Sequence, residues 1–484
     1  MALEILMPND GSISGRSSTN DDGTSTAEPG TEVGSNEENK VKSVAVVLAK
    51  KDNTFITYGL VYTDRIAPKA NSNSYESVAK FSKSDFESYY KDDNFEQEVN
   101  VFVFCNPTSD LLTTLNAISF SEPNTTWVNA ACEVKAGISN MPDVNTSIWA
   151  DNSFLMSNAS IATRLLPKEY DDWDSYRKPE EAFNLSGVNL EGSEKEVDNL
   201  EKGGAIKVER VVARLDYKDG SRDGNHIYDV LTSMKVDADG NTTDGPYFIK
   251  VDLGRMCLVN MSNQFYYLPR VSDTGLATNA KLCGSETSKN YVVGPYYEKF
   301  NKAASELEQA PESYGYANYF NYPFFNSNGK LDGEANYDRW FTSNVDDVLG
   351  GNVLDDWNNK HDYHVWRYAT ENVIPGVQNQ KNGISTGIVF KAKLMADASI
   401  FTDKSITYPD ADELIKYLNN VGDSLKGDGA DPFLYMFSNR LYLKWEAVRD
   451  AVKKECVVLT YTTDKKEPDV TINSNTPLYI AVYG

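Results

Sequence analysis

Histidine, basic residues and long apolar runs are all scarce in this chain. Only three histidines occur among 484 residues, and 47 Lys plus Arg stand against 71 Asp plus Glu, a formal net charge of −24. So acidic a chain repels the phosphate backbone of nucleic acids and anionic membrane surfaces. No apolar run reaches the roughly 20 residues that a membrane-spanning helix needs. These deficits argue against a nucleic-acid partner and against a direct membrane span.

The cysteines are few and lack a metal-binding or redox pattern. Five cysteines cannot all pair with one another, and no CxxC or Cys/His spacing occurs among them. The chain is long enough to fold without disulfide bonds, so we interpret the cysteines as small buried apolar residues. The alternative is that a few of them pair as disulfides in an oxidising compartment. They are Cys105, Cys132, Cys257, Cys283 and Cys456.

The length of the chain and its strand pattern predict two β-rich domains. A chain of 484 residues exceeds one small core, since domains average roughly 150 residues. A polar stretch at 187–205, rich in Glu, Gly and Asn, precedes IKVERVVARLDY (206–217), where a new run of alternating residues begins. We therefore predict an N-terminal domain at 41–205 and a C-terminal domain at 206–484.

Alternating β-branched and aromatic residues predict a mainly β, antiparallel protein. The stretches at 41–50, 54–63 and 98–107 alternate in this way and are bounded by Asp-Asn and Asn-Pro turn signals. MCLVNMS, NGISTGIVFKAKLMA, KKECVVLTYTT and PLYIAVYG predict further strands. A few helices are expected in the second domain, where apolar residues recur at helical spacing. The helical positions are Leu414, Tyr417, Leu418 and Val421, and Leu441, Trp445, Val448 and Val452.

A short strand and a polar linker begin the chain. In LEILM (3–7), Leu3, Ile5 and Met7 fall on one face, and a proline ends the run. The composition at 17–40 offers almost nothing to bury, which predicts a flexible linker. The first ten residues lack the basic and apolar regions of an export signal, so we expect any such signal to have been removed already.

Arg16 lies in a setting that favours proteolysis. It is the only Lys or Arg in residues 1–39, and it stands among Gly, Ser and Thr. Exposed loops of small polar residues are where proteases cut. The sequence therefore predicts a protease-sensitive bond between Arg16 and Ser17.

A G-x-S-x-G motif at 383–387 raises the question of a serine hydrolase. The nucleophile elbow of such hydrolases joins a strand to a helix, and the catalytic His follows the Ser along the chain. Here a predicted strand, IVFKAKL, follows the motif, and His226, His361 and His364 all precede Ser385. We interpret the motif as a β-turn of small residues.

Two further motifs suggest metal sites without completing them. His361 and His364 in HDYH have no neighbouring His or Cys to supply the usual three or four zinc ligands. The acidic loop at 237–245 resembles a calcium loop, but Thr242 stands in place of the invariant Gly and Phe248 in place of the bidentate Glu. We expect a hairpin turn there, and a protein that is not an enzyme and has no metal or cofactor.

An aromatic cluster is the candidate for a surface that contacts sugars or proteins. Within it we assign a surface contact to Tyr316, Tyr319 and Tyr322. The favoured alternative is that these rings fill a core. The whole cluster is Tyr314, Tyr316, Tyr319, Phe320, Tyr322, Phe324 and Phe325.

Six stretches, taken in their order along the chain, carry a resemblance that no single motif carries. They are ILMPNDGSISGRSS, VKSVAVVL, VNVFVFCNPT, FLMSN, KVERVVARLDY and YATENVIPGVQNQKNGISTGIVFKAKL. Together they resemble the fimbrillin family, the pilins of the pili made by Bacteroides-like bacteria, over most of the chain.

The resemblance implies a major fimbrial subunit at the cell surface, anchored at the outer membrane. It also implies two transthyretin-like antiparallel β-sandwich domains, a lipoprotein precursor, and cleavage after Arg16 by an Arg-specific protease. In that scheme the cut removes residues 1–16 and empties the groove that holds Leu3, Ile5 and Met7. A strand from the next subunit then fills the groove by donor-strand exchange, and the resulting fimbria supports adhesion.

The resemblance has one departure and one rival. The family continues past this point with an aromatic-rich segment and a final donor strand, whereas this chain stops at Gly484. Either the chain is shortened, or it receives a strand without giving one. The rival is a surface carbohydrate-binding lipoprotein that does not polymerise and does not need Arg16. Expected partners are other fimbrial subunits, the protease and a receptor of unknown kind.

Overall fold

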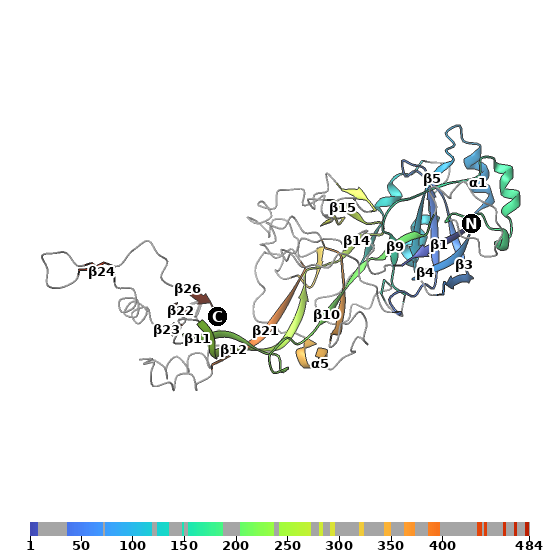
Figure 1. Ribbon diagram of the computed structural model, residues 1–484. Helices are drawn as coiled ribbons and strands as arrows, with labels where there is room; N and C mark the ends of the chain where they lie inside the picture. The colour runs from blue at the N-terminus through green and yellow to red at the C-terminus, as the bar shows by residue number, and fades with distance from the viewer. Residues whose placement is uncertain are drawn as a thin grey trace. The chain divides into compact units, whose positions relative to one another are not determined.

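The computed structural model shows a mainly β chain with few helices, which confirms the predicted class (Figure 1). The chain divides into two compact units. Unit 1 comprises Met1–Asp216, Cys257–Thr342 and Asn352–Val389, and unit 2 comprises Tyr217–Met256, Ser343–Gly351 and Phe390–Gly484. The structure describes residues 1–7, 36–70, 73–118, 123–134, 148–149, 153–186, 204–236, 242–272, 280–283, 291–295, 319–323, 343–349, 363–372, 386–396, 433–437, 440–442, 458–460, 469–471 and 480–483.

Seven strands of unit 1 form a closed, barrel-like sheet, which we call the ring. Around it β2 pairs with β3, β3 with β4, β4 with β1, β1 with β9, β9 with β7, β7 with β5, and β5 again with β2. Within the ring only the pair β1 and β9 is parallel. The strands are β1 (Ala2–Leu6), β2 (Val44–Ala49), β3 (Phe55–Pro68), β4 (Ser74–Lys80), β5 (Glu98–Cys105), β7 (Met156–Asn158) and β9 (Ile206–Arg210), and β8 (Ala162–Leu165) pairs with β5 as well.

The central strands of the ring are buried on both faces. In β2, Val44, Val46 and Leu48 pack in one core, whereas Ala45 and Val47 pack in another. In β5 the valines join the first core and the phenylalanines the second. Strands covered on both sides are apolar along their whole length, which explains the continuous run VAVVLA. The first core includes Leu3, Ile5, Val103 and Ile206, and the second includes Phe102, Leu111, Trp127 and Phe265.

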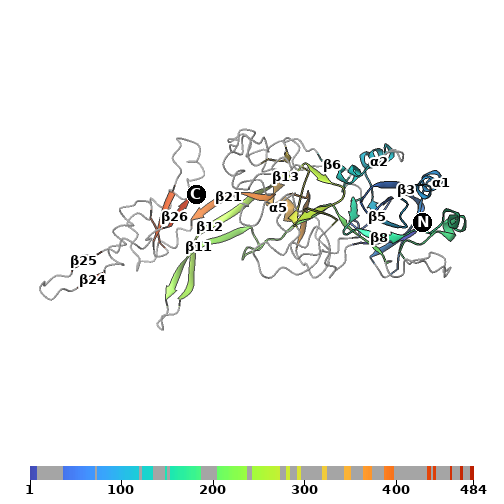
Figure 2. The ribbon, with the colours of Figure 1, turned by 90° about the horizontal axis from the view of Figure 1, so that it is seen from above.

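Two helices that the sequence did not predict, α1 (Lys83–Tyr90) and α2 (Ser109–Asn116), lie beside the ring (Figure 2). α1 buries two side chains in the first core, and α2 buries two in the second. The Thr108 hydroxyl caps α2 by accepting from the Leu111 N–H at 3.2 Å. Helices this short present too few apolar positions for a period to be recognised. No helix in the described part of the chain has the length and apolar character needed to cross a membrane.

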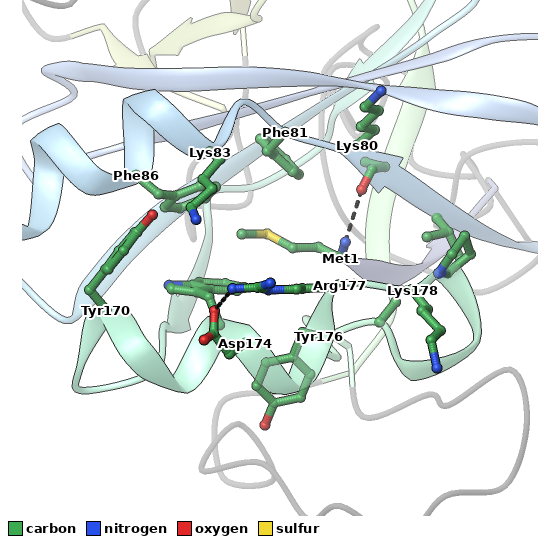
Figure 3. A pocket seen from close by; sticks show the side chains of 15 residues that line it. Met1, Lys80, Phe81, Lys83, Phe86, Tyr170, Asp174, Tyr176, Arg177 and Lys178 are labelled. Carbon is green, nitrogen blue, oxygen red and sulfur yellow. Dashed lines mark hydrogen bonds and ion pairs between the residues drawn. The ribbon is translucent and has the colours of Figure 1, made fainter.

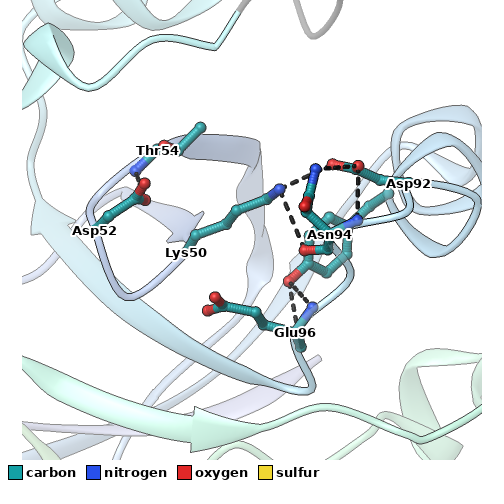
Figure 4. Close-up of polar contacts among 7 residues, drawn as sticks. Lys50, Asp52, Thr54, Asp92, Asn94 and Glu96 are labelled. Atoms are coloured by element: carbon teal, nitrogen blue, oxygen red, sulfur yellow. Dashed lines mark hydrogen bonds and ion pairs between the residues drawn. The ribbon is translucent and has the colours of Figure 1, made fainter.

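Polar contacts tie the turn after β2 to the end of α1 (Figure 4). The Lys50 ammonium lies 2.8 Å from an Asp92 carboxylate oxygen and donates to the Asn94 carbonyl at 3.4 Å. The Tyr89 hydroxyl donates to the Glu96 carbonyl at 2.6 Å, and burial raises the pKa of Tyr89 to about 12. Each of these groups has its partner within the chain, so we assign the cluster a structural role.

Beside several short strand pairs, unit 1 has a third core. Its buried residues are Cys257, Leu258, Val259, Met261, Tyr322 and Ala369. The pairs are β10 (Val212–Tyr217) with β20 (His364–Thr370), β13 (Met261–Ser262) with β18 (Phe320–Asn321), β14 (Gln264–Tyr266) with β6 (Ala131–Glu133), and β15 (Arg270–Ser272) with both β16 (Lys281–Leu282) and β17 (Tyr291–Val292).

Unit 2 contains most of a long hairpin and several short strands. β11 (Ile227–Val236) pairs with β12 (Thr242–Val259), which also pairs with β19 (Ser343–Asn344) and β21 (Gly387–Ala396). The helix α5 (Val345–Leu349) follows β19. Further along, β22 (Phe433–Phe437) lies between β23 (Arg440–Tyr442) and β26 (Ile480–Tyr483), and β24 (Val458–Thr460) pairs with β25 (Asp469–Thr471).

The structure corrects the boundary predicted between residues 205 and 206. β9 begins at Ile206 and pairs with β1 and β7, so strands on both sides of the polar stretch belong to one sheet. Strand pairing joins residues far apart in the chain, and a local change of composition does not reveal it. The described strands of unit 1 form a barrel-like sheet, and two transthyretin-like sandwiches are not evident among the described strands.

One segment predicted as a helix begins as a strand in the structure. Leu441 lies in β23, where it pairs with Met436 of β22. Tertiary pairing here outweighs the helical spacing of the apolar residues. The other seven positions assigned to helices lie outside the described residues.

Gly59 in β3 has no room for a methyl group. A Cβ built there would lie 2.6 Å from the Lys80 carbonyl oxygen and 3.0 Å from two ring carbons of Phe81. Because the backbone of β4 cannot rotate away, we expect Gly59→Ala to lower the free energy of unfolding by about 1–3 kcal/mol, measured by urea unfolding. Gly220→Ala is the control, since a Cβ there meets nothing within 4 Å. Equal losses in the two variants would contradict the packing argument.

Candidate functional site: the groove filled by the N-terminal strand

β1 lies between two strands of the ring, in a space that we call the β1 groove (Figure 1). On one side it runs antiparallel to β4, with Leu3 opposite Ser77 and Ile5 opposite Tyr75. On the other side it runs parallel to β9, with Ile5 opposite Ile206. β1 is therefore an interior strand of the ring, and its removal would leave β4 and β9 as unpaired edges.

Backbone hydrogen bonds hold both ends of β1. The Ala2 N–H donates to the Phe183 carbonyl at 2.7 Å, and the Ala2 carbonyl accepts from the Leu185 N–H at 2.8 Å. At the other end, the Met7 N–H donates to the Asn73 carbonyl at 2.8 Å. The strand is thus fixed along its whole length, and its neighbours come from segments that follow it by about 70 to 200 residues.

The apolar side chains of β1 complete the first core. Leu3, Ile5 and Met7 are 1%, 0% and 1% exposed, whereas Glu4 and Leu6, on the opposite face, are partly exposed. This is the alternation that the sequence predicts for the strand. Burial of each large apolar side chain stabilises a fold by about 1.5–3 kcal/mol, so these three are a major part of what retains β1.

The outward face of β1 makes a smaller contribution. A Glu4 carboxylate oxygen accepts from the Ser74 hydroxyl at 2.6 Å and lies 3.1 Å from the Lys69 ammonium. The Lys69 side chain is 43% exposed, and exposed ion pairs contribute less than about 1 kcal/mol. Glu4 therefore helps to set the register of β1 against β4, while the inward face supplies most of the stability.

A buried ion-pair network anchors the segment that precedes β2. Glu38 is 3% exposed, and its two carboxylate oxygens accept from one Arg214 nitrogen at 2.8 and 2.9 Å. The Tyr368 hydroxyl donates to Glu38 at 2.7 Å, and Arg214 pairs with Asp216 at 2.7 Å. Burial and the nearby Glu38 charge raise the pKa of Tyr368, so its hydroxyl keeps the proton that it donates. The network joins this segment to β10 and β20.

This anchoring corrects the end of the predicted linker. Residues 36–40 were part of the linker at 17–40, yet Glu38 is buried and the Asn39 side-chain oxygen accepts from Arg210 at 2.6 Å. A carboxylate in a polar segment carries no local sign of burial, because the arginines that pair with it follow more than 170 residues later. Residues 8–35 lie outside the described residues.

The structure describes only some of the residues assigned to proteolysis and to surface contact. Arg16, Ser17 and Tyr316 lie outside the described residues. Tyr319 is half-buried. Tyr322 is 1% exposed, so its assignment as a surface contact is wrong. The pairing of β13 with β18 brings this segment into the third core, which was the alternative interpretation.

The motifs considered for catalysis and metal binding are only partly described. Ser385, His361 and residues 237–241 lie outside the described residues. His364 is the first residue of β20, and His226 precedes β11. Among the described residues, no group of three or more His, Cys, Asp or Glu side chains is arranged to hold a metal ion.

The described cysteines are buried thiols, as the sequence predicts. Cys105, Cys132, Cys257 and Cys283 are free and buried. Burial raises the pKa of Cys132 to about 11 and that of Cys257 to about 12, which suppresses the reactive thiolate. Cys456 lies outside the described residues.

The inward face of β1 is expected to dominate the stability of the ring. Ile5→Ala leaves a cavity in the first core, so it should lower the free energy of unfolding by about 2–5 kcal/mol. Leu6→Ala, on the half-exposed face of the same strand, is the matched control and should cost about 1 kcal/mol or less. Urea unfolding of both variants is the measurement. A loss as large for Leu6→Ala as for Ile5→Ala would mean that β1 is not seated as described.

The buried Glu38 network can be tested in the same way. Glu38→Gln removes the charge that compensates Arg214, and it should lower the free energy of unfolding by roughly 3 kcal/mol. Glu37→Gln changes the preceding, exposed carboxylate and should leave stability within about 0.5 kcal/mol of wild type. Limited proteolysis should then cut Glu38→Gln earlier than Glu37→Gln near residues 36–40. Identical stability and identical cleavage would show that the network does not anchor this segment.

No family model matches the chain, and no curated protein matches it. Among solved structures, it is similar to a candidate cell adhesion protein from Parabacteroides distasonis, at 14% identity and a TM-score of 0.27, over 55% of this chain and 56% of that one. It is similar to the tip fimbrial protein Mfa3 of Porphyromonas gingivalis, C-terminally truncated, at 10% identity and a TM-score of 0.25, over 60% and 68% of the two chains. A fimbrial assembly protein from Parabacteroides distasonis is similar at 9% identity and a TM-score of 0.26, over 61% and 76%. The chain spans 56% of the first of these structures, and likenesses this low assign it neither fold nor function.

Proposed function

We propose that this chain is a structural subunit of a bacterial cell-surface fimbria that supports adhesion. Its subunits would assemble by donor-strand exchange after an Arg-specific protease cuts at Arg16, and the fimbria would be anchored at the outer membrane. Its partners would be other fimbrial subunits. In this proposal the two β-rich units correspond to the two transthyretin-like domains that the resemblance to the fimbrillin family implies.

The position of β1 is the observation that carries the proposal. β1 is hydrogen-bonded on both sides within the ring, yet the only covalent path from it to the other strands of the ring passes through residues 8–35, which contain Arg16. A cut there converts an integral strand into a ligand held without a covalent bond. Few strands of a closed sheet can be separated from it by breaking one peptide bond.

Loss of β1 would leave a surface that favours strand addition. β4 and β9 would each present unpaired N–H and C=O groups, and the sites of Leu3, Ile5 and Met7 would be an apolar cleft open to water. Such an edge and cleft recruit an extended segment from another chain, with main-chain hydrogen bonds giving affinity and side-chain sites giving specificity. Polymerisation would follow from that vacancy.

The Glu38 network would keep the remainder of the subunit folded after the cut. Glu38 and Asn39 bind Arg214 and Arg210, which lie beyond β9 and at its end. The chain before β2 is therefore attached independently of β1. Release of residues 1–16 would open the groove without freeing β2, the strand at the centre of both cores.

The rival proposal, a carbohydrate-binding lipoprotein that does not polymerise, rests on the aromatic cluster. Burial of Tyr322 removes one of its three assigned tyrosines from the surface. That proposal also gives no reason for a separable β1. We propose in addition that the chain is not an enzyme, since neither G-x-S-x-G nor HDYH comes with the partner residues that its chemistry requires.

A peptide-binding experiment tests the donor-strand mechanism. The full chain is treated with an Arg-specific protease, and a fluorescent peptide of residues 1–7 is added in excess to compete with the released strand. The cut chain should bind the peptide, detected by fluorescence anisotropy, whereas the uncut chain should not, because its own β1 fills the groove. Mass spectrometry should report the loss of residues 1–16, and size analysis should report oligomers.

Two controls make the result specific. Arg16→Lys keeps the charge but resists an Arg-specific protease, so it should remain uncut and bind no peptide. A peptide with Asp in place of Ile5 should fail to bind the cut chain, because it would bury an unpaired charge in the first core. Equal peptide binding by protease-treated wild type and Arg16→Lys would rule out cleavage at Arg16 as the step that opens the groove.

A further inference from the structure

A pocket of about 350 Å³ lies beyond the N-terminal end of β1. Residues of β4, of α1, and of two 3-10 helices, η4 (Tyr170–Tyr176) and η5 (Pro179–Glu181), line it together with Met1. Figure 3 shows the Met1 side chain reaching between Phe86 and Lys83 on one side and Arg177 and Asp174 on the other. The pocket is thus continuous with the β1 groove.

The antiparallel register of β1 and β4 continues toward this pocket. Ala2 lies opposite Val78, and Met1 and Ala79 exchange both backbone bonds, with the Met1 nitrogen donating at 2.9 Å and the Ala79 nitrogen at 2.8 Å. One step further, a residue would lie opposite Lys80, and a second step would place a residue opposite Phe81. The same register therefore offers positions opposite Lys80 and Phe81 to a strand that extends two residues past the position of Met1.

The second added residue would share the inward face with Met1, Leu3 and Ile5, because side chains alternate along a strand. At that depth the pocket wall is aromatic. The Phe81 and Phe86 ring centroids are 5.8 Å apart, and those of Phe86 and Trp173 are 4.9 Å apart. A large apolar side chain is the group that such a wall favours.

The first added residue would face a different environment. Lys80, which would lie directly opposite this residue, is exposed. In an antiparallel sheet the pair next to a hydrogen-bonded pair is a non-hydrogen-bonded pair, in which the two side chains lie closer together. Of the basic residues that line the pocket, Arg177 pairs with Asp174 and Lys178 with Glu181, and the positive charge of Lys83 interacts with the carboxylate of Glu87. Among the described residues, no ion pair involves Lys80. A locally basic rim on a chain of net charge −24 favours an acidic residue at this position.

We propose that this pocket is a further subsite of the β1 groove, specific for a strand of a partner subunit that carries an acidic residue opposite Lys80 and a large apolar residue opposite Phe81. The inference rests on the proposed function, since it describes the strand that would replace β1. It adds a selection rule: partner strands that end at the position of Met1 leave the subsite empty, and strands that reach two residues further bind more tightly.

The test places the two residues on the chain itself. The Arg16→Ala variant of residues 1–484, which cannot be cut at position 16, is prepared with Phe-Asp, Ser-Ser or Phe-Lys added before Met1. Ser-Ser is the reference, because burial lowers the pKa of the Met1 amino group to about 5 and any extension relieves the cost of burying that amine. Phe-Asp should raise the folding equilibrium constant about tenfold over Ser-Ser in urea unfolding, as expected for a newly buried aromatic side chain.

A charge reversal at Lys80 tests the acidic preference separately. With Lys80 present, Phe-Asp should be more stabilising than Phe-Lys, and Lys80→Glu should reverse this order. Equal unfolding midpoints for the Phe-Asp and Ser-Ser chains would overturn the subsite. If Phe-Asp remained more stabilising than Phe-Lys in the Lys80→Glu background, the role of Lys80 would be overturned. None of these measurements involves cleavage or assembly, so failure of the proposed fimbrial function would leave them unaffected and would be recognised separately.

Discussion

Insertion of β1 between β4 and β9 is the interaction on which the rest of unit 1 depends. It closes the ring, completes the first core with Leu3, Ile5 and Met7, and satisfies the backbone of two strands that would otherwise be edges. A closed sheet has no edge through which it can add strands. Closure of the ring therefore depends on one short segment, β1. That segment precedes Arg16 in the sequence.

Two kinds of force hold the two sides of this segment. Residues 1–7 are held by apolar burial and backbone pairing, which another strand of similar pattern can reproduce. Residues 36–40 are held by Glu38 and Asn39 against Arg214 and Arg210, an arrangement of charges in a buried setting that a different segment cannot easily replace. Under the proposed function, this difference would make the first segment exchangeable and the second permanent. If the proposed subsite exists, the pocket beyond Met1 would extend the exchangeable part and would let it discriminate between strands.

The elements that differ from the sequence predictions share a cause. α1 and α2 were missed because each has eight residues and buries two of them, too few to display a helical period. β9 was assigned to the second domain because a polar stretch precedes it, although its partners are β1 and β7. Glu38 was assigned to a linker because its neighbours are polar. Tyr322 was assigned to the surface because aromatic residues in a polar stretch look the same whether they cover a core or a ligand.

Local patterns in the sequence are enough to predict the class of the protein and the composition of its first strand. Alternation put Leu3, Ile5 and Met7 on one face and predicted the strands at 41–50, 54–63 and 98–107, because side-chain period is a local property of the chain. That two cores cover the strand β2 was not predicted. Which strands pair with one another depends instead on tertiary contacts. The parallel pairing of β1 with a strand 200 residues later, the arginines that neutralise Glu38, and the pocket at the end of β4 all arise from contacts between distant segments, and such contacts are selected by the packing of the whole unit and not by any local pattern.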